Sequence, residues 1–284
     1  MKMMLNSFYV DDLIKRAIQE DINYLDVTSD YLLPPEQTGA AKFVAKASGV
    51  LCGLDVAFRV FQLLDPTFSA KAYQSDGDPV EKGDLIAEFT GNARQLLKGE
   101  RTALNLLQHM SGIATATAQA VALTKGTKAS IADTRKTLPG LRALQKYAVT
   151  IGGGKNHRFN LSDAAMLKDN HIDAGGGITS AISKLREKVG HMTKIEVETR
   201  SLDELREALA AGADIIMLDN MSCDEMKKAV AINDGKVLLE ASGNVTKDNI
   251  RSVAETGVDI ISLGALTHSV KCFDISMRIQ TVKN

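Results

Sequence analysis

The chain has 284 residues, of which 44% are hydrophobic, so it is long enough to bury a sizeable core in one large domain or two. Lys and Arg together number 34 against 35 Asp and Glu, which gives a formal net charge of −1 without a basic tail or stripe. This balance makes nucleic acid and anionic membranes poor candidates for partners. No apolar run has the length of a membrane span and no signal-peptide core precedes Tyr9, so we expect a cytoplasmic protein.

The N-terminal part of the chain predicts a mixture of helices and strands. Apolar residues at helical spacing predict helices over residues 10–20 and 56–64, and alternation predicts strands over 40–47, 68–73 and 85–89. The acidic and hydroxyl-rich stretch Asp26-Val27-Thr28-Ser29 is expected to cap the next element. A long helical region covers residues 92–123, and we expect a break in it at Ser111-Gly112.

The turn between two of these strands resembles that of a biotinyl or lipoyl carrier domain. It runs from Asp76 through Gly77 and Pro79 to Gly83 and Asp84. The carrier lysine between two methionines is missing, and turn-forming residues explain the stretch more simply. We therefore interpret it as scaffold.

Beyond Lys128 the pattern becomes a regular alternation of short apolar runs and amphipathic helices. Helices are expected over residues 202–211, 222–232 and 246–256. The apolar runs are residues 130–132, 164–167, 195–197, 214–218, 237–239 and 259–263. Such an alternation indicates right-handed βαβ units and a parallel sheet.

The residues that close these runs are the candidates for chemistry. They are Asp133, Lys168, Glu198, Asp219, Ser242 and Gly264. In a parallel α/β barrel the carboxyl ends of the strands converge on one mouth. A doubly wound open sheet would gather them too, but no GxGxxG or GxxxxGKS motif follows any run. We favour an incomplete barrel, because fewer than the usual eight strands are legible.

The predicted mouth combines cations with carboxylates. Arg135, Lys136, Arg158 and Lys168 suit carboxylate and phosphate groups. Each alone is more simply a solvated loop charge, but together they indicate a site for a polyanion. Glu198 and Asp219 suit Mg²⁺ held partly through substrate phosphate, and glycines after the last two runs can cradle a phosphate. These features fit a phosphorylated sugar with a pyrophosphate, bound beside a small polycarboxylate.

Motifs along nearly the whole chain are similar to those of one enzyme family. They include Gly99-Glu100-Arg101-Thr102, Asp133-Thr134-Arg135-Lys136-Thr137, Asn156-His157-Arg158, Lys168-Asp169-Asn170-His171, Leu218-Asp219-Asn220-Met221 and Gly264-Ala265-Leu266-Thr267-His268-Ser269. With these the chain resembles quinolinate phosphoribosyltransferase, also called nicotinate-nucleotide pyrophosphorylase (carboxylating), of NAD biosynthesis. Asn244 departs from the family pattern, which usually has a second glycine there, and Leu25 stands where glycine often precedes Asp26.

The resemblance implies an α/β fold of two domains. An N-terminal α/β sandwich is expected over residues 1–111, with residues 273–284 packing back on it, and a partial, TIM-like α/β barrel over residues 112–272. The resemblance also implies a homodimer or larger assembly in which Arg101 enters the partner's active site. The substrates it implies are quinolinate and phosphoribosyl pyrophosphate, with Mg²⁺ as cofactor.

The resemblance assigns roles residue by residue. Quinolinate is expected to contact Arg101, Arg135, Lys136, His157, Arg158 and Lys168. Glu198 and Asp219 are expected to hold Mg²⁺ and the ribose hydroxyls. Ser242, Gly243, Gly264 and His268 are expected to line the phosphate pocket. Lys136, Lys168, Glu198 and Asp219 are the expected catalytic residues.

Two further expectations concern Glu196 and the histidines. Glu196 lies two residues before Glu198, and we expect only Glu198 to face the mouth. His157, His171 and His268 show no tight ligand spacing, so we do not expect a transition-metal site.

Three alternatives remain open. A molybdenum-transport-associated relative shares the fold but lacks the KDNH and GALTHS forms found here. A phosphosugar isomerase or aldolase would not explain four clustered cations. A carrier module built on the Asp76 turn would require a modified lysine, whose absence an intact mass would show.

Overall fold

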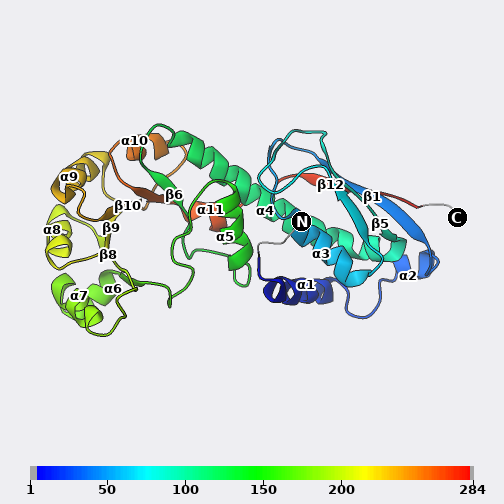
Figure 1. Cartoon of the computed structure of the whole chain (residues 1–284), viewed down its shortest axis with the longest axis horizontal. Coiled ribbons are helices and arrows are strands. Elements are labelled where there is room, and N and C mark those ends of the chain that lie inside the picture. The colour runs from blue at the N-terminus through cyan, green and yellow to red at the C-terminus, as the bar shows by residue number, and fades with distance from the viewer. Residues whose placement is uncertain (1–4, 282–284) are drawn as a thin grey trace. The chain divides into compact units, whose positions relative to one another are not determined.

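The structure is a computed structural model that describes residues 5–281, in which the chain forms two compact units (Figure 1). Unit 1 comprises Met1–Ala118, Leu138–Gly153 and Ser269–Asn284, and unit 2 comprises Gln119–Thr137 and Gly154–His268. The last residues of the expected C-terminal segment, 282–284, lie outside the described part. Among the described residues, no helix is both long and apolar enough to cross a membrane.

Unit 1 is built on an antiparallel sheet in the order β12-β1-β5-β3. Its strands are β1 (Thr38–Ala45), β3 (Ser69–Ala72), β5 (Leu85–Asn92) and β12 (Ile275–Thr281). The C-terminal strand β12 pairs along β1, from Ala45 opposite Ile275 to Gly39 opposite Thr281. A short antiparallel pair joins β2 (Gly49–Val50) to β4 (Pro79–Val80), and β4 lies within the turn that resembles a carrier domain.

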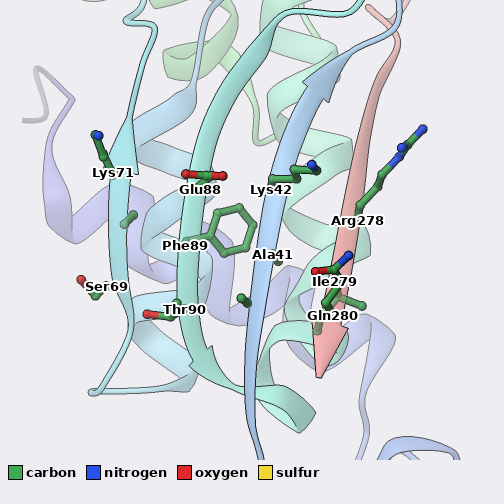
Figure 2. A pocket seen from close by; sticks show the side chains of 12 residues that line it. Ala41, Lys42, Ser69, Lys71, Glu88, Phe89, Thr90, Arg278, Ile279 and Gln280 are labelled. Atoms are coloured by element: carbon green, nitrogen blue, oxygen red, sulfur yellow. The ribbon is translucent and has the colours of Figure 1, made fainter. Parts of the chain in front are cut away.

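The two faces of this sheet differ because side chains alternate along a strand. Phe43 and Phe89 are buried and pack with Phe61 of helix α3 (Leu54–Leu64); the ring centroids of Phe43 and Phe89 are 4.8 Å apart. On the opposite face, Lys71, Glu88, Lys42 and Arg278 form a cross-strand row over a hollow of about 840 Å³ (Figure 2).

Two further helices of unit 1 differ in how far the sequence predicted them. Helix α1 spans Ser7–Asp21, close to the predicted 10–20, whereas α5 (Arg142–Ile151) was not predicted. The short helix α2 (Ser29–Leu32) begins where Asp26 Oδ1 accepts the N–H groups of Thr28 and Ser29, at 3.0 and 3.2 Å. The capping interpretation of this acidic stretch is confirmed.

Helix α4 (Ala93–Leu123) is continuous, so the expected break at Ser111-Gly112 is wrong. The Ser111 hydroxyl is buried against the neighbouring chain, where it accepts the Cys52 N–H at 2.9 Å and donates to the Cys52 carbonyl at 3.0 Å. A Cβ at Gly112 would collide with the Lys271 carbonyl. These small residues allow other segments to approach the helix closely, which is why they occur in its middle.

Unit 2 is a six-stranded parallel sheet in the order β6-β11-β10-β9-β8-β7. All six predicted strands are confirmed: β6 (Ser130–Ala132), β7 (Ala165–Leu167), β8 (Ile195–Thr199), β9 (Ile215–Asp219), β10 (Leu238–Ser242) and β11 (Ile260–Ser262). The first strand, β6, pairs with the last, β11, while β6 and β7 stand at the two ends of the sheet. The prediction of an incomplete parallel barrel is therefore confirmed.

The helices of unit 2 are α6 (Asp169–Gly175), α7 (Ile178–Arg186), α8 (Leu202–Ala210), α9 (Cys223–Asn233), α10 (Ile250–Ala254) and α11 (Ala265–His268). Helices α7 to α10 lie along the outside of the strands (Figure 1). Helix α10 begins later than predicted, because the side chain of Asn249 accepts the Thr246 N–H at 2.8 Å and holds a turn before it. The helices leave the carboxyl ends of the strands open to form a site.

Candidate functional site

The carboxyl ends of the unit 2 strands surround a cavity of about 620 Å³. It is lined by Thr134, Arg135, Lys136, His157, Arg158, Met166, Lys168, Glu198, Met217, Asp219, Asn220, Glu240, Ser242, Gly243, Asn244 and Ser262. Every predicted site residue of unit 2 except Asp133, Gly264 and His268 is in this lining. The structure thus brings together side chains that are far apart in sequence.

The upper layer of the cavity consists of residues at or just beyond the ends of four strands: Lys168, Glu198, Asp219 and Ser242. Lys168 Nζ lies 2.6 Å from Glu198 Oε2, so a cation and a carboxylate already pair across the mouth. Asp219 pairs in register with Ser242, which places a second carboxylate beside the loop that follows β10. Two carboxylates therefore lie on neighbouring strands at the opening, with a cation beside one of them and a hydroxyl beside the other.

The loop after β10 has a backbone shaped for glycine. Gly243 has a φ of +83°, and a Cβ there would collide with the Asn220 amide. Asn244, at the position where the family usually has glycine, has a φ of +50°, and its Nδ2 donates to Asn220 Oδ1 at 2.9 Å. Asn adopts left-handed φ more readily than other non-glycine residues. The departure at Asn244 therefore keeps the backbone conformation that a glycine would have.

Gly264 and His268 adjoin the cavity through Lys136. A Cβ at Gly264 would lie 2.9 Å from Lys136 Cδ and 3.1 Å from the His268 ring, so the glycine leaves room for both side chains. The Thr267 hydroxyl donates to the Lys136 carbonyl at 2.8 Å and fixes this loop against the β11–α11 connection. Lys136 and His268 are both exposed, as residues that meet a soluble anion would be.

Arg158 is half-buried and lies close to another guanidinium. Its Nη1 donates to the Ala164 carbonyl at 2.8 Å, which orients the side chain. Burial, followed by the charge of Arg135, lowers the pKa of Arg158 below its usual value, while the charges of Glu196 and Asp163 act in the opposite direction. Two guanidiniums that repel each other gain most when an anion binds between them.

His157 is held by protein groups on both ring nitrogens. Its Nδ1 accepts the Arg158 N–H at 2.8 Å, and its Nε2 lies 2.9 Å from Glu196 Oε2. Its backbone N–H donates to Asp133 Oδ1 at 2.9 Å, which ties the loop to the end of β6. Because Nδ1 accepts a hydrogen bond, the neutral ring carries its hydrogen on Nε2 and donates it to Glu196.

The expectation that Glu196 faces away from the mouth is wrong. Residues two apart on a strand point to the same face, so Glu196 lies below Glu198 on the inner side of β8. It is 4% exposed and bonds to His157, which itself lines the cavity. Glu196 belongs to a lower layer that includes Met166, Met217 and Glu240.

Glu240 is the charged residue of the cavity lining that the sequence interpretation missed. It is 1% exposed, and its Oε1 lies 3.6 Å from His157 Nε2. Burial, followed by the charge of Glu196, raises the pKa of Glu240 to about 7. A signal was present, because Glu240 is the one charged residue within the apolar strand Leu238–Ser242, where a buried parallel strand ordinarily carries none.

Arg101 lies elsewhere, on an exposed turn of helix α4 in unit 1. The structure therefore divides the predicted site residues into a group around the cavity and a single residue on the other unit.

The partial parallel barrel makes this an α/β protein, and the mixed cations and carboxylates at its strand ends are suited to a polyanion. Two domain-family models match it: quinolinate phosphoribosyl transferase, N-terminal domain, over residues 26–111, and the C-terminal domain of the same enzyme over residues 113–278. The chain belongs to the quinolinate phosphoribosyltransferase family, an enzyme family.

Relatives match the chain over nearly their whole length. A probable nicotinate-nucleotide pyrophosphorylase (carboxylating) of Bacillus subtilis is 46% identical over 275 residues, which are 97% of this chain and 95% of that protein. The nicotinate-nucleotide pyrophosphorylase (carboxylating) of Mycobacterium leprae is 44% identical over 94% of this chain and 95% of its own. The crystal structure of NadC from Streptococcus pyogenes superposes with a TM-score of 0.95 at 42% identity, covering 99% of this chain and 100% of that one.

Proposed function

We propose that the protein transfers the phosphoribosyl group of phosphoribosyl pyrophosphate to the ring nitrogen of quinolinate and removes the adjacent carboxylate. The products are nicotinate mononucleotide, CO₂ and pyrophosphate. The observation that carries the proposal is the cavity at the strand ends, where Arg135, Lys136, Arg158 and Lys168 share one space with Glu198 and Asp219. The family and the names of the relatives support the same reaction.

The cations would recognise quinolinate through its two carboxylates. Arg158 is oriented by the Ala164 carbonyl and lies near Arg135, so the pair presents planar donors suited to bidentate contacts. His157 would form a wall of the site rather than a donor, because both its ring nitrogens already bond to protein. Nicotinate has a single carboxylate, so it would satisfy fewer of these donors.

The carboxylates would hold Mg²⁺ with the diphosphate. Glu198 and Asp219 offer oxygen ligands on neighbouring strands, a donor set that fits Mg²⁺ shared with substrate phosphate. Mg²⁺ bound there would neutralise charge on the leaving pyrophosphate. Lys168 Nζ lies 2.6 Å from Glu198 Oε2. When Glu198 binds Mg²⁺, the Lys168 ammonium would be released to bind anionic groups of the substrates. The loops at Gly243 and Gly264, where there is no room for a Cβ, would bind the phosphates.

The chemistry needs positioning more than it needs a nucleophile from the protein. The pyridine nitrogen attacks the anomeric carbon as pyrophosphate leaves, through a state with sugar cation character that Glu198 and Asp219 would stabilise. The ring nitrogen becomes cationic, and the ring then accepts the electron pair left by the departing carboxylate. The residues around the cavity would hold the ring and exclude water.

The activity is tested with purified protein, Mg²⁺, phosphoribosyl pyrophosphate and quinolinate labelled in the carboxylate next to nitrogen. Labelled CO₂ and nicotinate mononucleotide should appear in equal amounts, and nicotinate should be a poor substrate. Comparable turnover of nicotinate, or a lack of labelled CO₂, would contradict the proposal.

We propose further that the protein acts as a homodimer in which Arg101 serves the partner's cavity. Arg101 is exposed on α4, and it stands in the motif that the family uses for this residue. Arg101→Ala and Lys168→Ala should each be nearly inactive. When the two are unfolded and refolded together, half of the dimers are mixed and carry one intact site of two, so about a quarter of wild-type activity should return.

Complementation separates a shared site from a residue that acts within its own chain. A mixture that stays inactive while refolded wild-type protein recovers would show that Arg101 does not act in trans. Size-exclusion chromatography of both variants provides the control that they still associate.

A further inference from the structure

The lower layer of the cavity contains an acid that the reaction outlined above leaves unused. Glu240 is 1% exposed, yet its side chain reaches the cavity wall. It lies two residues before Ser242 on β10 and so points to the same face one layer deeper. Its register partner on β9 is Met217, an apolar neighbour that keeps water away from this layer.

The groups that face Glu240 come from every side of the barrel. Glu196 on β8, His157 in the loop before β7, Ser262 on β11 and Asp133 after β6 all act on it. Lys168 and Asp219 line the same cavity one layer above. Burial and then Glu196 raise the pKa of Glu240 to about 7, and His157 opposes them, so much of Glu240 is a neutral acid at neutral pH.

His157, Glu196 and Glu240 also have the spacing of a metal site, with one ligand atom from each within 4.8 Å of the others. The hydrogen bonds of the His157 ring favour a hydrogen on Nε2 rather than a metal ion bound there. A metal at Nε2 requires a lone pair there, but Nδ1 accepts the Arg158 N–H at 2.8 Å, so a neutral ring carries its hydrogen on Nε2. The buried Oε1 atoms of both glutamates have no hydrogen-bond partner among the described residues.

The proposed reaction requires a proton at one step. When the carboxylate next to the ring nitrogen leaves as CO₂, the carbon–carbon bond breaks and its electron pair stays on the ring carbon. That carbon becomes part of the product only by forming a C–H bond. In the lower layer, where Glu240 and its neighbours are shielded from solvent, an acid that is neutral at the working pH can supply the proton.

We propose that Glu240 is the catalytic acid that gives this proton to the ring carbon after CO₂ has left, an assignment that rests on the proposed function. The electron pair takes the hydrogen of the Glu240 carboxyl group, which leaves a carboxylate and a new C–H bond. Glu240 regains one proton from solvent in each turnover, and no oxidant or reductant is needed. Glu196, bonded to His157, keeps Glu240 in its acid form.

The test separates the two halves of the reaction in a single turnover. Pyrophosphate reports phosphoribosyl transfer, and labelled CO₂ with nicotinate mononucleotide reports the second half. Glu240→Gln keeps the size of the side chain and removes the acid. It should release pyrophosphate within about twofold of the wild-type rate and form nicotinate mononucleotide at least tenfold more slowly, since a general acid contributes about 10²–10⁴ in rate. Glu187→Gln, an exposed carboxylate beyond α7, is the matched control and should change neither rate.

The outcomes also separate this assignment from the proposed function. Wild-type protein that releases neither pyrophosphate nor CO₂ would refute the function. A Glu240→Gln variant in which both rates fall equally, or in which neither changes, would overturn the assignment of the acid while the function stands.

A second measurement covers the case in which Glu240→Gln fails to fold. The rate of product formation in wild-type protein should fall as pH rises through about 7, where Glu240 loses its proton. Glu196→Gln removes the neighbouring charge and should move this fall to lower pH, while leaving the pH dependence of pyrophosphate release in place. A fall that does not move in Glu196→Gln would overturn the assignment.

Discussion

Glu240 should make the stability of the protein depend on pH in a way that Glu240→Gln removes. The pKa of Glu240 rises from its usual 4.5 to about 7, first because it is buried and then because of Glu196. Between these two values the folded protein holds a proton that the unfolded chain has released, so the free energy of unfolding falls as pH rises across this window. The contribution of Glu240 to the free energy of unfolding does not change with pH below 4.5 or above about 7. At about 1.4 kcal/mol per pKa unit, the loss is about 3 kcal/mol.

Urea denaturation of wild-type protein and Glu240→Gln at about pH 5 and pH 8 measures this effect. The free energy of unfolding of the variant minus that of the wild type should be about 3 kcal/mol larger at pH 8 than at pH 5. Comparing two proteins cancels the other titrating groups that they share. Glu187→Gln should show no such change. An equal difference at both pH values would refute the physical account of Glu240 without any measurement of activity.

Five further substitutions, at four positions, test the packing and the site. Gly112→Ala should lower the free energy of unfolding by about 1–3 kcal/mol despite the better helix propensity of alanine, because its Cβ meets the Lys271 carbonyl; thermal unfolding measures this. Asn244→Gly should be nearly neutral, whereas Asn244→Val should cost about 1–3 kcal/mol in denaturant unfolding, because φ is +50° there. Arg158→Ala should weaken quinolinate binding by about 2–4 kcal/mol while leaving that of phosphoribosyl pyrophosphate nearly unchanged, and Asp219→Ala should do the reverse; calorimetry separates them, and unchanged binding in both would remove them from the site.

The strands of unit 2 could be predicted because each is a short apolar run bounded by polar residues or glycine. The end of β9 at Asp219 and that of β10 at Ser242 both show this. The continuity of α4 could not be predicted in the same way. Ser111 and Gly112 are poor helix formers in isolation, and what retains them is contact with Cys52 and Lys271, which are distant in sequence. Local propensity contains no information about such contacts.

The upper layer of the cavity was predictable for a related reason. A residue that ends a parallel strand lies at the mouth whichever way the rest of the strand faces. The lower layer was not, because strands buried on both faces show no alternation that distinguishes inside from outside. Residues two apart on a strand point to the same face. With Glu198 placed at the mouth, Glu196 therefore lies beneath it, and Glu240 likewise lies beneath Ser242.

Other positions of the lower layer show which side chains occur there when packing alone decides. Met166 and Met217 fill their positions in it with apolar side chains, which cost nothing in desolvation. At the next position Glu240 is buried to 1% exposure beside a second carboxylate, an arrangement that lowers stability by about 3 kcal/mol once it ionises. A methionine or leucine would avoid that loss and pack against the same neighbours. Retaining an acid there, in contact with the cavity and close to His157, points to a role in the chemistry rather than in the fold.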